Sequence, residues 1–403
     1  MEIKNIVIVC DYAFFEGGAA NVAIQSALAF AKYTNFNIYC FAGNGDPCEE
    51  LKNSRINVIT LKMPDLLGNK NKIDAFIKGI YNKKAGDQLK KLLSTLNREE
   101  TIVHIHTWTK VLSSAVFKVC NEMEFKTYLT IHEYFLACPN GACYNYVKQC
   151  ICELHPLSKE CIRCNCDARS YPQKIWRCAR QIIQNKVLNQ FKDLNYVFIS
   201  SYQEKQLLRR IPTMENKFLV KNPINVGRRM QIQAENNYIY LYIGRLSGEK
   251  GPDLFCEAVT KANVQGVMIG DGILKNDLER KYPNIKFTGW LNKSQINEWL
   301  TKTRLLIFPT LWYEGSPLTV PEVLAHGIPC IVTNCSSATD DIFNGINGEI
   351  VDTNVEDIVM AIEKCKNRNY LKKLSKNAYN MFNEDRGSKK WYVENTLKIY
   401  EEK

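Results

Sequence analysis

Short apolar runs alternate with longer stretches of helical periodicity along almost the whole chain. The first series of runs comprises residues 5–10, 36–42, 56–61, 101–106, 126–132 and 195–200. The second series comprises residues 238–244, 264–270, 285–289, 304–310, 329–333 and 348–351. Helical patterns lie between them, for example at 253–262 and 293–303. This alternation predicts an α/β protein with two doubly wound parallel sheets.

A break between the two series marks the domain boundary. Pro, Asn and Gly in residues 221–227 predict a linker. We therefore expect an N-terminal domain at 1–225, completed by a helix at 386–403, and a C-terminal domain at 226–385. The 403-residue length fits two domains.

Hydropathy also bears on the compartment. The N-terminal apolar run is too short for a signal peptide, and no run reaches membrane-spanning length. We therefore expect a cytoplasmic protein.

The stretch EGSPLTVPEVLAHGIP contains two carboxylates eight positions apart, Glu314 and Glu322. The pattern predicts a strand, a loop and the start of a helix near Pro321. Ligands of open α/β sheets lie at the carboxyl ends of strands, beside helix N-termini that favour anions. Two carboxylates around such a turn suit a phosphorylated polyol such as a nucleotide sugar. Alternatively, Glu322 only complements the helix dipole.

Each half of the chain has a glycine-marked turn after its first strand. Gly17 and Gly18 lead into a predicted helix, where paired glycines allow a phosphate to approach the backbone closely. In the second half, Gly244 is followed by Arg245 and Lys250, two cations suited to clamp a diphosphate. The alternatives are a plain tight turn and exposed loop cations.

Several motifs together resemble those of a known family. GRLSGEKGPD, IGDGILKNDLE, FTGWL, FPTLWYEGSPLTVPEVLAHGIPCIVT and GINGEIV occur in the order and spacing of family 4 glycosyltransferases. The resemblance covers essentially the whole chain. It implies the GT-B fold, in which two Rossmann-like domains face each other across an interdomain cleft.

The resemblance also implies roles for single residues. Arg245 and Lys250 would bind the donor diphosphate and stabilise the departing nucleotide. Glu314 would hold the transferred sugar, and His132, at the end of a strand, would contact the donor sugar or the acceptor. The alternative is that backbone groups at the strand end satisfy His132. We expect His104 and His106 to face opposite sides of their strand and rank His106 below His132.

The implied donor site extends beyond these residues. Glu322 would bind the ribose hydroxyls, and Gly17 and Gly18 would let the N-terminal loop close on the donor. The backbone that accompanies Glu314 comprises Gly315, Ser316, Pro317 and Leu318. The sequence departs from the family pattern at Thr310, Pro321 and His326, but none of these changes removes a charged group.

The implied reaction is sugar transfer from a nucleotide-diphosphate sugar with retention at the anomeric carbon. We expect no catalytic metal, because no Asp-rich motif is present. The acceptor would be a glycan or a lipid-diphosphate-linked sugar in capsule, O-antigen or exopolysaccharide assembly, and we expect no nucleic acid partner. The alternatives are a sugar-nucleotide epimerase and a non-catalytic sugar-nucleotide-binding subunit.

Cysteines are concentrated in one segment. Eight of the sixteen lie between Cys138 and Cys178. Cys161 and Cys164 have zinc-ligand spacing, and Cys152 and Cys166 could complete a structural zinc site. Reduced free thiols are the alternative.

The net charge of +11 is concentrated between Lys159 and Arg229, where fifteen basic residues face five acidic ones. Residues 173–191 predict a helix with Ile175 and Ile182 on an apolar side and basic outer faces that contain Lys174, Arg177, Arg180 and Lys186. We expect this helix to lie on an anionic membrane surface, peripheral to the inner face of the cytoplasmic membrane. Alternatively, it is a core helix with a charged outer face.

Overall fold

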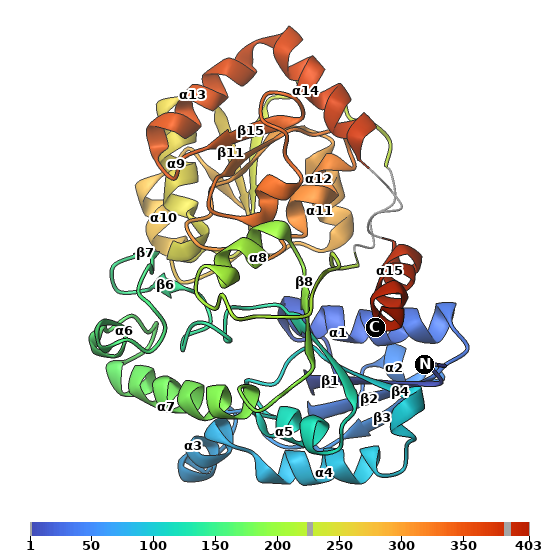
Figure 1. The fold of residues 1–403 in the computed structure, drawn as a ribbon. Coiled ribbons are helices and arrows are strands. Elements are labelled where there is room, and N and C mark those ends of the chain that lie inside the picture. The colour runs from blue at the N-terminus through green and yellow to red at the C-terminus, as the bar shows by residue number, and fades with distance from the viewer. Residues whose placement is uncertain (1, 224–228, 383–387, 403) are drawn as a thin grey trace.

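The computed structural model describes residues 2–223, 229–382 and 388–402. It has two parallel sheets, each covered by helices on both faces (Figure 1). The N-terminal domain lies below the C-terminal domain in this view. The boundaries expected at 225–226 and 385–386 lie outside the described residues.

The N-terminal sheet has seven strands in the order β3-β2-β1-β4-β5-β8-β9. Their bounds are β1 Asn5–Tyr12, β2 Asn37–Asn44, β3 Asn57–Thr60, β4 Thr101–Ile105, β5 Lys126–Ile131, β8 Leu194–Phe198 and β9 Lys217–Leu219. The central strand β1 is apolar on both faces because helices cover both. Ile6 and Ile8 pack with α1 (Gly17–Tyr33), whereas Val7 and Val9 pack with α4 (Lys83–Leu93) and α5 (Ala115–Glu122).

The remaining helices of this half of the chain flank the sheet or lie in loops. They are α2 Glu49–Lys52, α3 Lys72–Ile80, α6 Lys159–Arg163, α7 Tyr171–Leu188 and α8 Ser201–Leu208. A small antiparallel hairpin lies before α6 and is formed by β6 (Tyr144–Asn145) and β7 (Cys150–Ile151). The apolar pattern did not predict this hairpin or β9.

The C-terminal sheet has six strands in the order β12-β11-β10-β13-β14-β15. Their bounds are β10 Ile239–Ile243, β11 Gln265–Ile269, β12 Lys286–Phe287, β13 Thr303–Phe308, β14 Cys330–Thr333 and β15 Gly348–Val351. The helices are α9 Pro252–Lys261, α10 Lys275–Lys281, α11 Lys293–Leu300, α12 Thr319–Leu324, α13 Val355–Lys366 and α14 Arg368–Met381. The predicted fold class, two doubly wound α/β domains, is confirmed.

The last helix, α15 (Lys389–Glu401), leaves the C-terminal domain and packs beside α1 (Figure 1). Its Tyr392 hydroxyl is hydrogen-bonded to Ser26 of α1 at 2.9 Å. Its Tyr400 hydroxyl lies 2.5 Å from Nδ1 of the buried His104, whose Nε2 lies 2.7 Å from the Thr130 hydroxyl. The C-terminal end of the chain therefore helps to complete the core of the N-terminal domain.

Helix α7 faces the opposite way from the prediction. Lys174 and Arg180 are buried, Arg177 pairs with Asp167 at 2.9 Å, and Ile175 and Ile182 are 40% and 52% exposed. The expected basic outer face, of which only Lys186 is exposed, is therefore wrong.

The inward polar groups have partners in an irregular loop. Arg180 donates to the backbone oxygens of Thr109 and Pro139, and Gln181 donates to that of Leu136 at 2.9 Å. Gln184 donates to the oxygen of Phe135 at 2.9 Å. Loop carbonyls outside the sheet need such donors when they are buried, and α7 supplies them.

No helix among the described residues has both the length and the apolar character needed to cross a membrane.

We predict that Tyr400→Phe lowers the midpoint of thermal unfolding by several degrees. The substitution leaves Nδ1 of His104 buried without its partner, a loss of about 1–3 kcal/mol. Tyr33→Phe is the matched control, because the Tyr33 side chain is 40% exposed and its hydroxyl makes no hydrogen bond within the described residues. Equal midpoints for Tyr400→Phe and wild type, measured by circular dichroism, would contradict this role of the hydroxyl.

Candidate functional site

The turn after β10 lies against the end of β13 because of one glycine. Gly251 has φ +65°, a conformation that glycine adopts without strain. A Cβ atom at this position would lie 1.9 Å from the backbone oxygen of Pro309, so no larger residue fits. The preceding residue, Lys250, is thereby held next to the loop that follows β13.

Lys250, in the turn after β10, forms an ion pair with Glu314, in the loop after β13. Trp312 holds both partners. Its Nε1 donates to Oε2 of Glu314 at 2.8 Å, and Nζ of Lys250 lies 4.6 Å from its ring centroid. Both charged side chains are less than one-fifth exposed. Two of the predicted residues are therefore together, and the tryptophan between them was not predicted.

Arg245 is exposed and lies five residues before Lys250, in the same turn after β10. Its side chain makes no hydrogen bond or ion pair within the described residues. Gly244 lies against the turn after β11, where a Cβ at Gly270 would lie 1.9 Å from the oxygen of Gly244. The turn is thus fixed by its backbone, and the Arg245 guanidinium remains available to a ligand.

The loop after Glu314 has unused backbone donors. The N–H groups of Gly315, Ser316 and Leu318 donate to no group in the described part of the chain, and Pro317 has no N–H. A Cβ at Gly315 would lie 3.4 Å from the backbone oxygen of His132 in the N-terminal domain. The predicted backbone segment therefore lies beside the predicted histidine.

Glu322, in α12, lines a pocket of about 200 Å³. Arg229, Lys293, Asn297 and His326 also line it. Burial raises the pKa of the Glu322 carboxyl, and the positive charges of Lys293 and Arg229 oppose that rise. The carboxylate has no hydrogen-bond partner among the described residues, so its oxygens are free to accept from a ligand.

Three histidines form a column that ends at His132. The rings of His104 and His106 stack at 4.6 Å, and those of His106 and His132 stack at 5.3 Å. Nδ1 of His106 lies 3.1 Å from Nε2 of His132. The expectation that His104 and His106 face opposite sides is wrong, because residues two apart on a strand share a face.

Burial keeps this column uncharged. Burial lowers the pKa of His132 to about 3. Burial, and the repulsion that a protonated His132 would exert, lower the pKa of His104 to about 3. Burial, together with the repulsion that protonated His104 and His132 would exert, lowers the pKa of His106 well below its usual value. Nε2 of His106 is buried without a hydrogen-bond partner in the described residues. His132 is thus a neutral hydrogen-bonding group at neutral pH.

Tyr313, next to Glu314, lies among side chains of the other domain. Its hydroxyl donates to Oε1 of Glu153 at 3.0 Å, and the Arg210 guanidinium lies 5.2 Å from its ring centroid. The rings of Tyr134 and Tyr202 are each 5.9 Å away. This contact was not predicted from the sequence, in which its local signal is the aromatic pair Trp312 and Tyr313 before Glu314.

Two predicted glycines stand apart from these contacts. Gly17 has φ +70° at the start of α1, and a Cβ on Gly17 or Gly18 would meet no atom within 4 Å. Both residues are exposed. They leave room for a ligand at the start of α1, but they touch none of the residues described above.

The four cysteines expected to bind zinc do not form one ligand set. No group of three or more His, Cys, Asp or Glu residues within the described ranges has an arrangement that could hold a metal ion. Instead, Nζ of the buried Lys174 lies 3.5 Å from Sγ of Cys161 and 3.3 Å from Sγ of Cys166. Cys164 accepts a contact from Nδ2 of Asn145 at 3.4 Å, and Cys152 is partly buried. The arrangement gives no support to a zinc site at Cys152, Cys161, Cys164 and Cys166.

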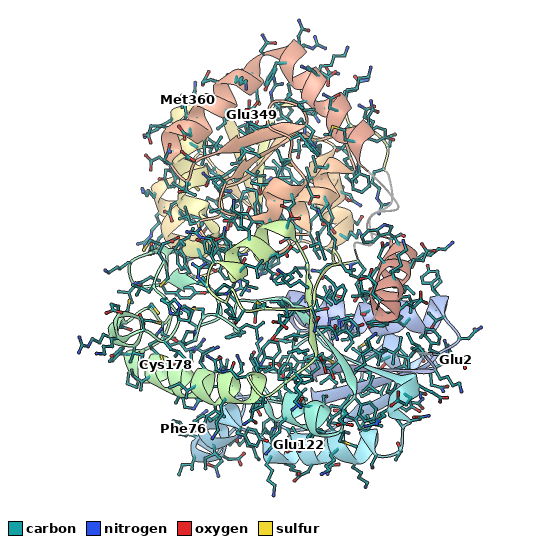
Figure 2. All side chains as sticks on the ribbon, in the orientation of Figure 1. Glu2, Phe76, Glu122, Cys178, Glu349 and Met360 are labelled. Carbon is teal, nitrogen blue, oxygen red and sulfur yellow. The ribbon has the colours of Figure 1, made fainter. Side chains whose placement is uncertain are left out.

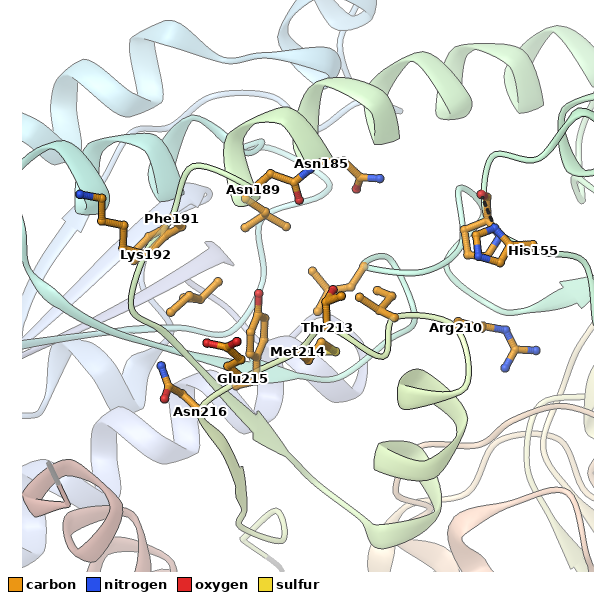
Figure 3. A pocket seen from close by; sticks show the side chains of 16 residues that line it. His155, Asn185, Asn189, Phe191, Lys192, Arg210, Thr213, Met214, Glu215 and Asn216 are labelled. Carbon is orange, nitrogen blue, oxygen red and sulfur yellow. Dashed lines mark hydrogen bonds between the residues drawn. The ribbon is translucent and has the colours of Figure 1, made fainter.

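A separate pocket of about 430 Å³ lies in the N-terminal domain, between the end of α7 and the segment after α8 (Figure 3). Asn185, Lys192, Arg210 and Glu215 are among its polar lining residues. None of the predicted site residues lines it. Arg210 links this pocket to Tyr313, because its guanidinium lies over the Tyr313 ring.

The family comparison concerns the C-terminal domain. Residues 228–381, less than half of the chain, match the family model described as Glycosyl transferases group 1. The chain is 31% identical over 160 residues to UDP-Gal:alpha-D-GlcNAc-diphosphoundecaprenol alpha-1,3-galactosyltransferase of Escherichia coli, covering 36% of this chain and 41% of that protein. It is 28% identical over 172 residues to lipopolysaccharide 1,6-galactosyltransferase of Salmonella typhimurium, covering 38% and 47%. The matched segment thus spans less than half the length of these relatives.

Solved structures match over nearly the whole chain. HepE of Anabaena in complex with UDP has a TM-score of 0.65 at 13% identity and covers 99% of both chains. Sucrose-phosphate synthase of Thermosynechococcus elongatus has a TM-score of 0.70 at 15% identity and covers 98% of both. At these identities the likeness concerns the fold, and the chain has the GT-B fold.

Proposed function

We propose that the protein transfers a sugar from a nucleoside diphosphate sugar to a glycan or lipid-linked acceptor, with retention at the anomeric carbon. One observation carries the proposal: Lys250, which pairs with Glu314, shares its turn with the unpartnered Arg245, and three unused backbone N–H groups follow Glu314 in the chain. Such a site offers cations for a diphosphate and a carboxylate for sugar hydroxyls.

The diphosphate would lie between Arg245 and Lys250. Arg245 is exposed and unpaired within the described residues, so it can meet the anion without breaking an existing contact. Lys250 stays close to Glu314 through Trp312, which fixes the position of its ammonium group. Both cations would stabilise negative charge as it develops on the departing diphosphate, a preorganised electrostatic effect.

The sugar and the ribose would be held by carboxylates. Glu314, next to the free N–H groups of Gly315, Ser316 and Leu318, would accept hydrogen bonds from the transferred sugar. Glu322 would accept them from the ribose hydroxyls in its pocket of about 200 Å³. A carboxylate is well suited to this role because it only accepts hydrogen bonds when ionised.

Retention would follow from the leaving group. Neither glutamate has to attack the anomeric carbon, because the departing diphosphate can guide the acceptor from the same face. Positioning and charge stabilisation would then supply the catalysis, and no step requires a metal ion.

His132 would act as a hydrogen-bonding group. Since its pKa is lowered to about 3, it is neutral and its Nε2 is engaged with His106. Its Nδ1 can contact a hydroxyl of the sugar or of the acceptor. This role differs from that of a cationic histidine placed on a phosphate.

The acceptor class is also part of the proposal. Two relatives are named for a diphosphoundecaprenol-linked substrate and for lipopolysaccharide. We infer an acceptor of this kind, used in the assembly of a cell-surface polysaccharide on the cytoplasmic side of the membrane.

We predict that Lys250→Ala lowers kcat by about 10²–10³-fold, the effect of removing one preorganised charge. We predict that Glu322→Ala raises the donor KM by about tenfold, because the hydroxyl acceptor is lost. The thermal midpoint should change little in Glu322→Ala, whereas Lys250→Ala leaves the mostly buried Glu314 without its cation and should lower the midpoint while the protein still folds. The measurement is transfer and donor hydrolysis over a panel of UDP-, GDP- and ADP-sugars.

Lys261→Ala is the matched control, because Lys261 is an exposed lysine of α9 paired with Glu257 at 2.9 Å. It should behave like wild type. Wild-type turnover in Lys250→Ala would overturn the assigned role. Epimerised donor as the product would overturn the proposed reaction.

We predict that kcat does not fall with an apparent pKa near 6.5 as the pH is lowered from about 8 to 5. The lowered pKa of His132 means that the folded protein gains no proton there until near pH 3. The unfolded chain gains one near its ordinary pKa, so each such histidine reduces stability as the pH falls below about 6.5. A fall of kcat with a pKa of about 6.5 that disappears in His132→Asn would contradict the neutral assignment.

A further inference from the structure

Helix α3 has an exposed apolar face opposite the face by which it packs. Ala75 and Gly79 are buried, whereas Ile73, Phe76 and Ile77 are 73%, 54% and 59% exposed. The exposed residues follow the three- and four-residue spacing of one helix face. Leu67, just before the helix, is 61% exposed.

The packing of α3 holds this apolar face outward. The indole of Trp176 in α7 lies over Gly79, where a Cβ would be 2.5 Å from its Cζ2 atom. Nε1 of Trp176 donates to the backbone oxygen of Phe76 at 3.1 Å, and the two rings are 6.2 Å apart. The helix is therefore fixed to α7, and its apolar face cannot turn inward without losing these contacts.

Lysines surround the exposed face. Residues 66–96 contain seven lysines and two aspartates. One aspartate, Asp74, is engaged by Lys78 at 2.7 Å and by Asn69 at 2.9 Å. The exposed side chains of Lys70, Lys83 and Lys84 form no salt bridge within the described residues.

Figure 1 shows α3 and α4 at the edge of the N-terminal domain away from the C-terminal domain. Figure 2 places Phe76 at this lower edge. The face is therefore accessible while the two domains remain in contact.

We propose that this face docks the protein on an anionic lipid bilayer. The docking face consists of Leu67, Ile73, Phe76, Ile77 and the four exposed lysines Lys70, Lys72, Lys83 and Lys84. The apolar side chains would enter the boundary between head groups and acyl chains, and the lysines would meet the anionic head groups.

Charge favours a bilayer over a second copy of this chain. Two docking faces brought together would oppose two segments that each carry seven lysines and only two aspartates, a net repulsive arrangement. An anionic bilayer supplies opposite charge and an apolar phase at one surface. The helix that the sequence suggested for this role, α7, instead supports α3 through Trp176.

The inference does not depend on the proposed reaction, since docking needs no donor sugar. Binding of the full-length protein to vesicles is measured by co-sedimentation, with phosphatidylglycerol and phosphatidylcholine at equal amounts or phosphatidylcholine alone. We expect binding to the anionic vesicles at low salt and its loss as the salt rises past physiological strength. Glycosyl transfer to a soluble acceptor serves as a separate readout and should be unchanged in the docking variants.

Two variants separate the apolar and charged contributions. One double variant combines Phe76→Ser with Ile77→Ser, and the other combines Lys83→Gln with Lys84→Gln. Each should weaken the binding of the protein to anionic vesicles by about tenfold. Met360→Ser is the matched control, because Met360 is 62% exposed on α13 at the far end of the molecule (Figure 2). Thermal midpoints equal to wild type show that the variants fold.

Equal binding to neutral and anionic vesicles, or binding to neither, would overturn the proposal. So would an equal loss of binding in Met360→Ser. A concentration-dependent dimer that Phe76→Ser with Ile77→Ser abolishes, detected by sedimentation velocity, would assign the face to a second copy instead. Binding to vesicles that survives both docking variants would place the membrane contact elsewhere and refute this surface.

Discussion

Tyr313 and Glu314 are consecutive residues whose side chains are held by different domains. Glu314 pairs with Lys250 in the C-terminal domain, whereas Tyr313 donates to Glu153 and lies against Arg210 in the N-terminal domain. The planar peptide unit joins the Cα atoms of the two residues at a fixed separation, so a displacement of the backbone at Tyr313 also displaces the backbone at Glu314. The position of the candidate donor-site carboxylate therefore depends on how the N-terminal domain is seated.

The N-terminal side of this contact depends in turn on the polar interior of α7. Gln181 and Gln184 donate to carbonyls of the loop that follows Tyr134, and Arg180 donates to a carbonyl a few residues later. Tyr134 directly precedes these loop residues, and its ring lies 5.9 Å from that of Tyr313. An apolar inner face on α7 would leave these carbonyls unpaired, at a cost of about 1–3 kcal/mol each. The helix is therefore polar inside because its neighbour is an irregular loop instead of a sheet.

This arrangement explains which features the sequence could predict. Strands such as β1 and β13 were recognised because burial on both faces leaves a continuous apolar run in the chain itself. Lys250 and Glu314, which the structure brings together, were predicted as candidates because each lies in the loop that follows a strand. The orientation of α7 and the contact of Tyr313 depend on residues distant in the chain, so no local pattern reveals them. The shared face of His104 and His106 was available from strand periodicity and was misassigned.

Under the proposed function, the electrostatics of the site distinguish its two cations. Lys250 is mostly buried, and an uncompensated ammonium there would be costly, so Glu314 stabilises it while no ligand is bound. Arg245 is exposed and its solvated charge needs no such partner. A diphosphate would therefore be attracted first by Arg245 and would then share Lys250 with Glu314. The Lys250 ammonium would then have a negative partner both with and without the diphosphate. Glu314 would accept hydrogen bonds from sugar hydroxyls in place of part of its contact with Lys250. Because His132 is neutral, it adds no third positive charge, and the charge balance of the site is left to Arg245 and Lys250.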